Sequence, residues 1–380
     1  MICKRPLRVS SKRIRLLAGI GAVFLSLLLG AVPATAFVTQ TVVDVVSDFS
    51  SGTFDRTGLV NIPAENVSGV QLMPIGLSGE WVQDSRSLPV ALQELAAVSY
   101  GNYIYVLGGR LANGQATNRV FYLKANADGS IASIAESANR LPVALAGASA
   151  FVHETDGVAS IYVIGGAPIG LYSDWVPSKK TYRAAIDPTT GAPGSWDELL
   201  TQLPYGLYYA AVAVRGRDVY LAGGIQREDD LPFLPLMTTV GVMHSRLDTY
   251  GDLGEWELDT VPSLELQFDQ GVAAAQAIVY EGDTGDTIYV IGGRANAIGL
   301  GGSFAAYIKV AYADIDDDGN LSAWAESAGN LPVPLHGHGA VLVGGEEILL
   351  SGGRTDPNDP NADLQNTVKA ALIDPTNSSF

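Results

Sequence analysis

The sequence predicts an all-β fold in which one four-stranded unit is repeated, and three observations carry this prediction. The first is an apolar strand that ends in a glycine doublet, written IYVIGG at Ile161–Gly166 and again at Ile288–Gly293. The second is a Leu-Pro or Val-Pro step that recurs with each doublet. The third is an aromatic residue that precedes most of these prolines by six to eight positions. Markers that keep one order along the chain indicate internal repeats.

Five copies of the unit are recognisable. The doublets begin at Gly108, Gly165, Gly223, Gly292 and Gly352. The prolines are Pro89, Pro142, Pro204, Pro262 and Pro332. The aromatic residue is a tryptophan in four copies, and Ile134 takes its place in the other.

Within each copy, β-rich runs predict four short strands. LAAVSY and YIYVLGG flank Gly101-Asn102, and AAVAV and DVYLAGG flank Gly216-Arg217. Short links that contain glycine predict hairpins, because glycine readily adopts the positive φ that tight turns require. A third strand follows the loop after each doublet, and the strand that carries the tryptophan is the fourth. No stretch has a convincing helical period.

Four-stranded units at this spacing predict a β-propeller. A single twisted sheet has both faces exposed to solvent, whereas sheets stacked around an axis bury those faces against neighbouring sheets. We expect the doublets to lie where backbones run close and a side chain would obstruct them. Residues 83–380 hold the repeats. The N-terminal strands within residues 37–82 are expected to form a degenerate first blade, which gives six blades; in the alternative they close a ring of five.

These features resemble those of kelch-type β-propellers, the architecture of the galactose oxidase-like superfamily. The resemblance rests on the five Gly-Gly strands, the aromatic-to-proline step and turns such as Asp318-Gly319, and it extends from about Val70 to the end. It implies the fold but not a function, because such propellers host enzymes and passive scaffolds alike. A galactose-oxidase-like copper site would require a Tyr–Cys pair. The only cysteine is Cys3, so we expect no cofactor.

Residues 1–36 predict a signal peptide. A basic start precedes the apolar run Leu16–Val32, and Ala34 and Ala36 form the A-x-A pattern of a cleavage site. A transmembrane anchor is the competing interpretation, since the run reaches the lower limit for spanning a bilayer. Cleavage would release a secreted or surface-exposed product with no membrane insertion.

Composition excludes several classes of partner and chemistry. The formal net charge is −17, and such a surface repels phosphates, which excludes nucleic acid and anionic membranes as partners. Without the leader the chain has no cysteine, and therefore neither a disulfide nor a thiol nucleophile. G-x-S-x-G, H-E-x-x-H and phosphate-loop motifs are absent from the sequence. The sequence leaves the oligomeric state open.

The loops after the doublets and the links between blades open on one face around the channel, where we expect a ligand site. Two long loops carry candidate contacts for a protein or glycan ligand, namely Tyr172, Trp175, Arg227 and Asp229. The triplet GGR occurs three times, at Arg110, Arg294 and Arg354. Three such guanidinium groups could clamp a carboxylate or a sulfate. In the alternative, they pair with neighbouring acids on an acidic surface.

Two further patterns contain residue types that bind metal ions. His336 and His338 lie two apart on a predicted inner strand and so on one side of it. No third ligand is evident, so we expect a satisfied structural pair and no metal. DIDDDGN at Asp314–Asn320 resembles the start of a calcium loop, but the twelfth position falls on Ala325, where such a loop needs glutamate. Other copies of the unit place a hairpin turn here.

We therefore expect a non-catalytic binding or interaction module with a protein or glycan ligand on the loop face, and assign no catalytic residue. The first alternative is a carbohydrate-active enzyme, such as a sugar-acid epimerase or a lyase. It would use the three GGR arginines and His338 around the channel, with a carboxylate such as Glu94. The second alternative is a calcium-dependent adhesin.

Overall fold

The computed structural model describes residues 53–54, 60–61, 84–127, 129–168, 176–226, 236–258, 262–265, 267–268, 270–282, 285–295, 305–343, 345, 347–355 and 368–373. The chain forms two compact units, one of residues 1–86 with 124–133 and the other of residues 87–123 with 134–380. In the first unit, β1 (Thr53–Phe54) pairs antiparallel with β2 (Val60–Asn61). Strands are the only regular elements within the described ranges, which contain no helix.

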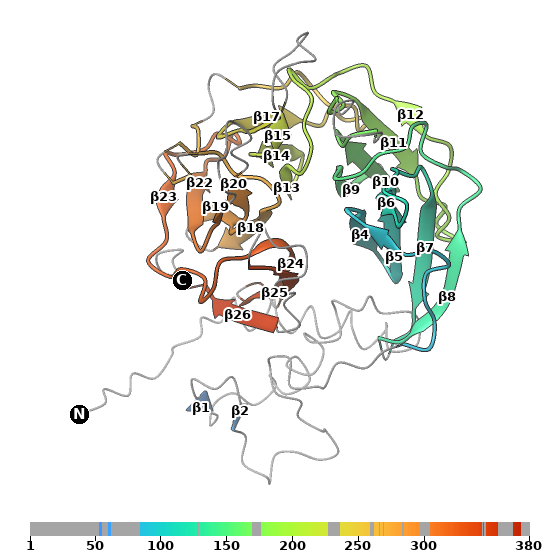
Figure 1. The fold of residues 1–380 in the computed structure, drawn as a ribbon, viewed down its shortest axis with the longest axis horizontal. Coiled ribbons are helices and arrows are strands. Elements are labelled where there is room, and N and C mark those ends of the chain that lie inside the picture. Colours follow the sequence, from blue (N-terminus) through green and yellow to red (C-terminus); the bar gives the residue numbers. More distant parts are fainter. Residues whose placement is uncertain are drawn as a thin grey trace. The chain divides into compact units, whose positions relative to one another are not determined.

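The repeats fold as five blades of a β-propeller, which confirms the predicted fold class. Figure 1 shows the blades arranged around a central axis, with the first strand of each blade innermost. The first blade comprises β4 (Ala96–Tyr100), β5 (Tyr103–Leu107), β7 (Val120–Ala125) and β8 (Ile131–Glu136). The second comprises β9 (Ser149–Thr155), β10 (Val158–Ile164), β11 (Thr181–Ala185) and β12 (Asp197–Glu198).

The remaining blades repeat this order. The third comprises β13 (Ala211–Arg215), β14 (Asp218–Ala222) and β17 (Val242–Arg246), and Glu257 bridges to His244 at the fourth-strand position. The fourth comprises β18 (Gln276–Gly282), β19 (Gly285–Ile291), β22 (Val310–Ile315) and β23 (Ala325–Glu326). The fifth comprises β24 (His336–Val343), β25 (Glu347–Arg354) and β26 (Val368–Leu372).

Small two-stranded sheets follow three of the doublets. β3 (Leu92–Gln93) pairs with β6 (Arg110–Leu111), β15 (Ile225–Gln226) pairs with β16 (Met237–Thr238), and β20 (Arg294–Ala295) pairs with β21 (Ala305–Ala306). The arginines of two GGR triplets thus begin β6 and β20, directly beyond the end of a second strand. This placement brings them to the channel at the doublet end of the blades.

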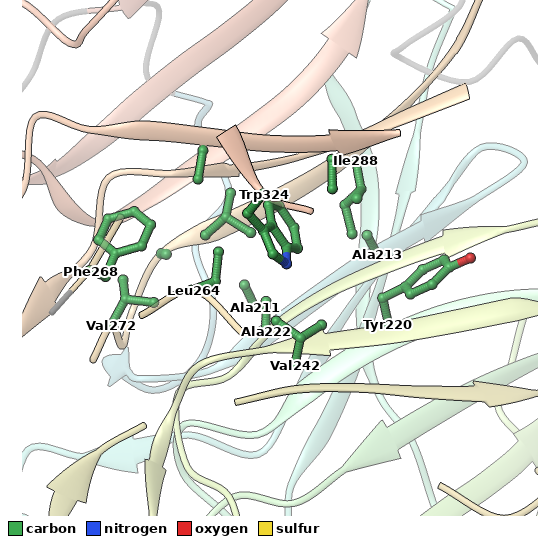
Figure 2. Close-up of a cluster of buried hydrophobic side chains, with 14 of the residues drawn as sticks. Ala211, Ala213, Tyr220, Ala222, Val242, Leu264, Phe268, Val272, Ile288 and Trp324 are labelled. Carbon is green, nitrogen blue, oxygen red and sulfur yellow. The ribbon is translucent and has the colours of Figure 1, made fainter. Parts of the chain in front are cut away.

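Hydrophobic side chains fill the space between neighbouring blades. Figure 2 shows the cluster between the third and fourth blades, where Trp324 lies near Ala211 and Ala222. Small side chains on the third blade leave room for the indole, whose Nε1 donates to the carbonyl oxygen of Pro262 at 2.9 Å. Trp324 is 6 % exposed, and burying an aromatic ring of this kind contributes about 2–3 kcal/mol. The aromatic marker in the sequence therefore reports packing between blades.

The glycine doublets lie at the same junctions. At Gly108, Gly165, Gly223 and Gly292, an added Cβ would stand closer than 3.0 Å to a carbonyl oxygen of the next blade. The N–H of the second glycine of each doublet donates to that same oxygen at 2.7–2.8 Å. Each first glycine also has φ between +60° and +66°. The expected close approach of backbones at the doublets is confirmed for these four junctions.

A tyrosine of the second strand links three blades to the next. The hydroxyl groups of Tyr105, Tyr162 and Tyr220 donate to the carbonyl oxygens of Gly191, Gly251 and Gly319 at 3.0, 2.7 and 2.7 Å. The acceptor lies in the turn between the third and fourth strands of the following blade. None of the three tyrosines is more than 1 % exposed. The tyrosine in the repeated IYV and VYL strands therefore acts as a latch between blades.

Replacing Tyr162 by phenylalanine is expected to lower the free energy of unfolding by about 1–1.5 kcal/mol, since the buried carbonyl oxygen of Gly251 loses its donor while the ring still packs. Urea denaturation followed by intrinsic fluorescence measures this loss. Tyr312→Phe is the matched control, because Tyr312 is a partly exposed tyrosine at the facing position of the fourth blade. Equal losses in the two variants would contradict the latch.

The blade count within the described residues is five, the alternative of the two expected counts. The segment 37–82, expected to supply a sixth blade or to close the ring, lies outside the described residues except for β1 and β2. The expected signal peptide at residues 1–36 also lies outside them. No helix in the described part of the chain has the length and apolarity needed to cross a bilayer.

Candidate functional site

A cavity of about 570 Å³ opens at the channel, at the doublet end of the inner strands. Its lining includes Glu94, Tyr209, Arg294, His338 and Arg354, drawn from four of the five blades, and the second blade adds backbone. This volume lies within the range of pockets that enclose small molecules. We therefore take this cavity as the candidate functional site.

One ring of equivalent positions surrounds the cavity, and we name it the collar. Its members have left-handed backbones and are Glu94, Gly147, Tyr209, Ala274 and Gly337, with φ of 56°, 59°, 59°, 53° and 60°. The backbone N–H of each member after the first donates to the carbonyl oxygen of the one before it, at 2.7–3.0 Å. A left-handed backbone is energetically unfavourable for residues other than glycine, and residues in this conformation concentrate at functional sites. Only two members, Glu94 and Tyr209, bring polar side chains.

Glu94 is the carboxylate of the cavity and has two partners. The hydroxyl of Tyr208 donates to its Oε2 at 2.9 Å, and Nε of Arg110 lies 3.2 Å from the same oxygen. The Glu94 and Arg110 side chains are 17 % and 13 % exposed. One of the three GGR arginines is thus used to fix a carboxylate, as the alternative interpretation of those triplets expects.

Two adjacent tyrosines join Glu94 to a second arginine. The rings of Tyr208 and Tyr209 lie 4.0 Å apart between centroids, and Cζ of Arg294 lies 5.9 Å from the Tyr209 centroid. Burial raises the pKa of both tyrosines, and the nearby charge of Glu94 raises each further. Both hydroxyl groups therefore stay protonated at neutral pH and act as donors.

His336 and His338 lie at the start of β24, at 8 % and 3 % exposure, and both line the cavity. Burial, with a smaller contribution from Lys369, lowers the pKa of His338 from 6.5 to about 4, so its ring is neutral at pH 7. Within the described part of the chain, neither ring nitrogen of His338 has a hydrogen-bond partner. The satisfied pair expected from the sequence therefore stays a prediction for His338. Its Cε1 lies 3.1 Å from where a Cβ on Gly292 would stand, so that glycine also makes room for the imidazole.

Of the nine candidate binding residues, Arg294, Arg354, His336 and His338 line the cavity, and Arg110 contacts its carboxylate. The two remaining GGR arginines, Arg294 and Arg354, line the same cavity. Two positive charges therefore lie in one hollow of a chain whose net charge is −17. The other four candidates lie outside the described residues: Tyr172, Trp175, Arg227 and Asp229.

Sequence reasoning named Glu94 only as a possible enzyme carboxylate and missed the collar. The amino-acid types alone do not reveal that glutamate and tyrosine have left-handed backbones at these positions. A positional signal did exist, because four collar residues stand five positions after a marker proline. In the fourth blade, Ala274 follows Pro262 at a longer distance, so the register is broken there.

The acidic segment considered for calcium forms a turn. Oδ1 of Asp316 accepts from the backbone N–H groups of Asp318 and Asn320 at 3.0 and 2.8 Å, and the side chain of Asn320 donates to Oδ2 at 3.0 Å. Among the residues that the structure describes, no group of three or more His, Cys, Asp or Glu side chains is placed to hold a metal ion. The Asp316 carboxylate is thus engaged in shaping the turn.

The sequence matches no family model and no curated protein. Among solved structures, that of YjhT is similar, with a TM-score of 0.55 over 78 % of this chain and 89 % of that chain, at 17 % identity. The likeness is one of fold. At this identity it shows the propeller architecture and carries no residue role from one chain to the other.

Proposed function

We propose that this chain is a secreted propeller of the kelch type that binds an acidic glycan, holding one sugar carboxylate in the central cavity. The observation that carries the proposal is the gathering of Arg294 and Arg354 in a cavity of about 570 Å³, inside a chain of net charge −17. The sequence supports secretion through the basic start, the apolar run and the A-x-A pattern.

The chemistry of the lining fits a carboxylate. Guanidinium groups present paired donors that match two carboxylate oxygens, and such charge-assisted hydrogen bonds are about twice as strong as neutral ones. Glu94 lies against Arg110, and the other two GGR arginines, Arg294 and Arg354, line the cavity that would receive the ligand. The protonated hydroxyl of Tyr209 and the neutral ring of His338 supply polar contacts for the rest of the sugar.

Titration calorimetry with D-glucuronate, its methyl ester and D-glucose tests this proposal. We expect glucuronate to bind and the two neutral sugars to bind at least tenfold more weakly. Arg294→Gln and Arg354→Gln should each weaken glucuronate binding about tenfold or more, because hydrogen bonds to charged groups contribute about 1.5–3 kcal/mol. Arg140→Gln is the matched control, since Arg140 is 53 % exposed and pairs with Glu136 on the surface. Equal binding of the acid and its ester would contradict the proposal.

One observation favours the enzyme alternative. Glu94 is a largely buried carboxylate that contacts both a tyrosine hydroxyl and an arginine, an arrangement suited to moving a proton. Proton NMR of the same glucuronate solution in D₂O separates the two functions. A binding module leaves the spectrum unchanged, whereas an epimerase replaces the proton next to the carboxylate by deuterium, and Glu94→Gln abolishes that exchange.

A further inference from the structure

A second hollow lies at the opposite end of the second blade from the central cavity. It has a volume of about 410 Å³ and is lined by Thr155, Ser160, Arg183, Tyr250 and neighbouring residues. We name it the hairpin-end hollow, because it adjoins the turn between β9 and β10. β9 begins beside the central cavity and ends at this hollow, so its seven residues separate the two sites by about 20 Å.

The corresponding junctions of other blades are filled by side chains. In the first blade, the position two residues before the latch tyrosine is Tyr103, whose ring covers the turn glycine Gly191 of the next blade. In the third blade that position is Asp218, which covers Gly319.

The third blade adds a further ring at its junction. His244 stacks on the latch Tyr220 with centroids 4.9 Å apart, and its Nε2 lies 3.0 Å from Oδ1 of Asp218. In the second blade, the position two residues before the latch Tyr162 is Ser160. Its small side chain does not reach the turn glycine Gly251, which Tyr162, Thr155 and Arg183 approach instead, and the hollow opens beside Ser160.

One arginine at the hollow is held in place, and one buried hydroxyl there has no hydrogen-bond partner among the described residues. Nη1 of Arg183 donates to Oδ1 of Asp252 at 2.8 Å and to the carbonyl oxygen of Tyr250 at 3.2 Å. Oγ1 of Thr155 is buried and has no hydrogen-bond partner among the described residues. The lining also includes two exposed carboxylates, Asp156 and Asp197.

An aromatic ring stands at the same place with its surface exposed. Tyr250 is 80 % exposed, and Val158 beside the hollow is 51 % exposed. The backbone N–H of Tyr250 donates to Oδ1 of Asp248 at 2.7 Å, which fixes the turn that presents the ring. An exposed tyrosine ring offers an apolar face to a ligand at little entropic cost, because only two side-chain torsions have to be ordered.

We propose that the hairpin-end hollow binds one pyranose ring of a neutral glycan. A sugar presents an apolar C–H face, which can stack on Tyr250, and a rim of hydroxyl groups, which both donate and accept hydrogen bonds. Carboxylates accept from sugar hydroxyls, and Arg183 donates to them. The two lining carboxylates repel anionic sugars, so this site differs in specificity from the acidic-glycan site and does not depend on it.

Saturation-transfer-difference NMR on the full chain tests this inference with D-glucose, D-galactose, D-mannose and N-acetyl-D-glucosamine as probes. We expect at least one of the four to receive saturation. Tyr250→Ala removes the stacking surface, and Ser195→Trp fills the hollow from its exposed rim. Each variant should reduce the apparent affinity at least tenfold. Met237→Ala, which changes a residue 57 % exposed in β16, is the matched control and should leave it unchanged.

Three results would overturn the inference. The first is that none of the four sugars receives saturation from the wild-type chain. The second is that Tyr250→Ala and Ser195→Trp bind as the wild type does while far-ultraviolet circular dichroism shows both folded. The third is that Arg294→Gln removes the signal, or that D-glucuronate displaces the hexose as strongly as the hexose itself does. That third result would place the sugar in the central cavity and leave the proposed function standing.

Discussion

Replacing Gly223 by alanine is expected to lower the free energy of unfolding by about 3 kcal/mol or more. An added Cβ would stand closer than 3.0 Å to the carbonyl oxygen of Val272 and 2.8 Å from its Cγ1. Val272 is fully buried in the cluster between the third and fourth blades, so it cannot retreat without opening that junction. The left-handed backbone of Gly223 adds about 1 kcal/mol of strain for any residue with a Cβ.

Gly352→Ala is the matched control for this prediction. Gly352 occupies the same place in the fifth doublet with φ of 68°, but among the described residues nothing lies within 4 Å of an added Cβ. We expect this variant to lose only the backbone contribution, about 1 kcal/mol. Guanidinium denaturation of both variants measures the difference. Equal losses would mean that the doublet serves its own turn and not the contact between blades.

The propeller could be predicted because its packing residues repeat along the chain. The doublets and the tryptophans pack between neighbouring blades, and the hairpin glycines form the turns within blades. Because each feature recurs from blade to blade, a signal that is weak in one copy becomes strong over the chain. The tyrosine latches were missed for the opposite reason. A tyrosine in an apolar strand looks like an ordinary core residue, and its acceptor lies 86–99 residues further along the chain.

Part of the candidate site was equally predictable. Arg294 and Arg354 stand directly after doublets, and His336 and His338 begin an inner strand, so their positions relative to the repeats place all four at the channel. Their role toward a ligand stays a prediction. Repetition cannot reveal Tyr209, because its side chain is unlike those of equivalent positions. Residues that differ between equivalent positions of the blades therefore cannot be assigned from the repeats and have to be located in the structure.

The stability of the wild-type chain is expected to fall more steeply than that of His338→Gln as the pH drops from 7 to 4. Folding lowers the pKa of His338 from 6.5 to about 4, because burial disfavours the charged ring. The unfolded chain therefore binds a proton at this residue before the folded chain does. The stability that this group contributes is fully present above pH 6.5 and is lost as the pH falls toward 4. The difference between the two proteins should reach about 3 kcal/mol at pH 4.

His153→Gln is the matched control for the pH dependence. Burial also lowers the pKa of His153, with Arg217 contributing and Glu154 opposing, but the residue is only partly buried and its effect should be smaller. Urea denaturation at half-unit pH steps gives the three curves. Parallel curves for wild type and His338→Gln would mean that the folded chain protonates this imidazole at the same pH as the unfolded chain, so that burial does not lower its pKa. Below pH 6.5 the cavity would then hold a charged imidazole beside Arg294 and Arg354, and its preference for carboxylates at that pH would no longer rest on the two arginines alone.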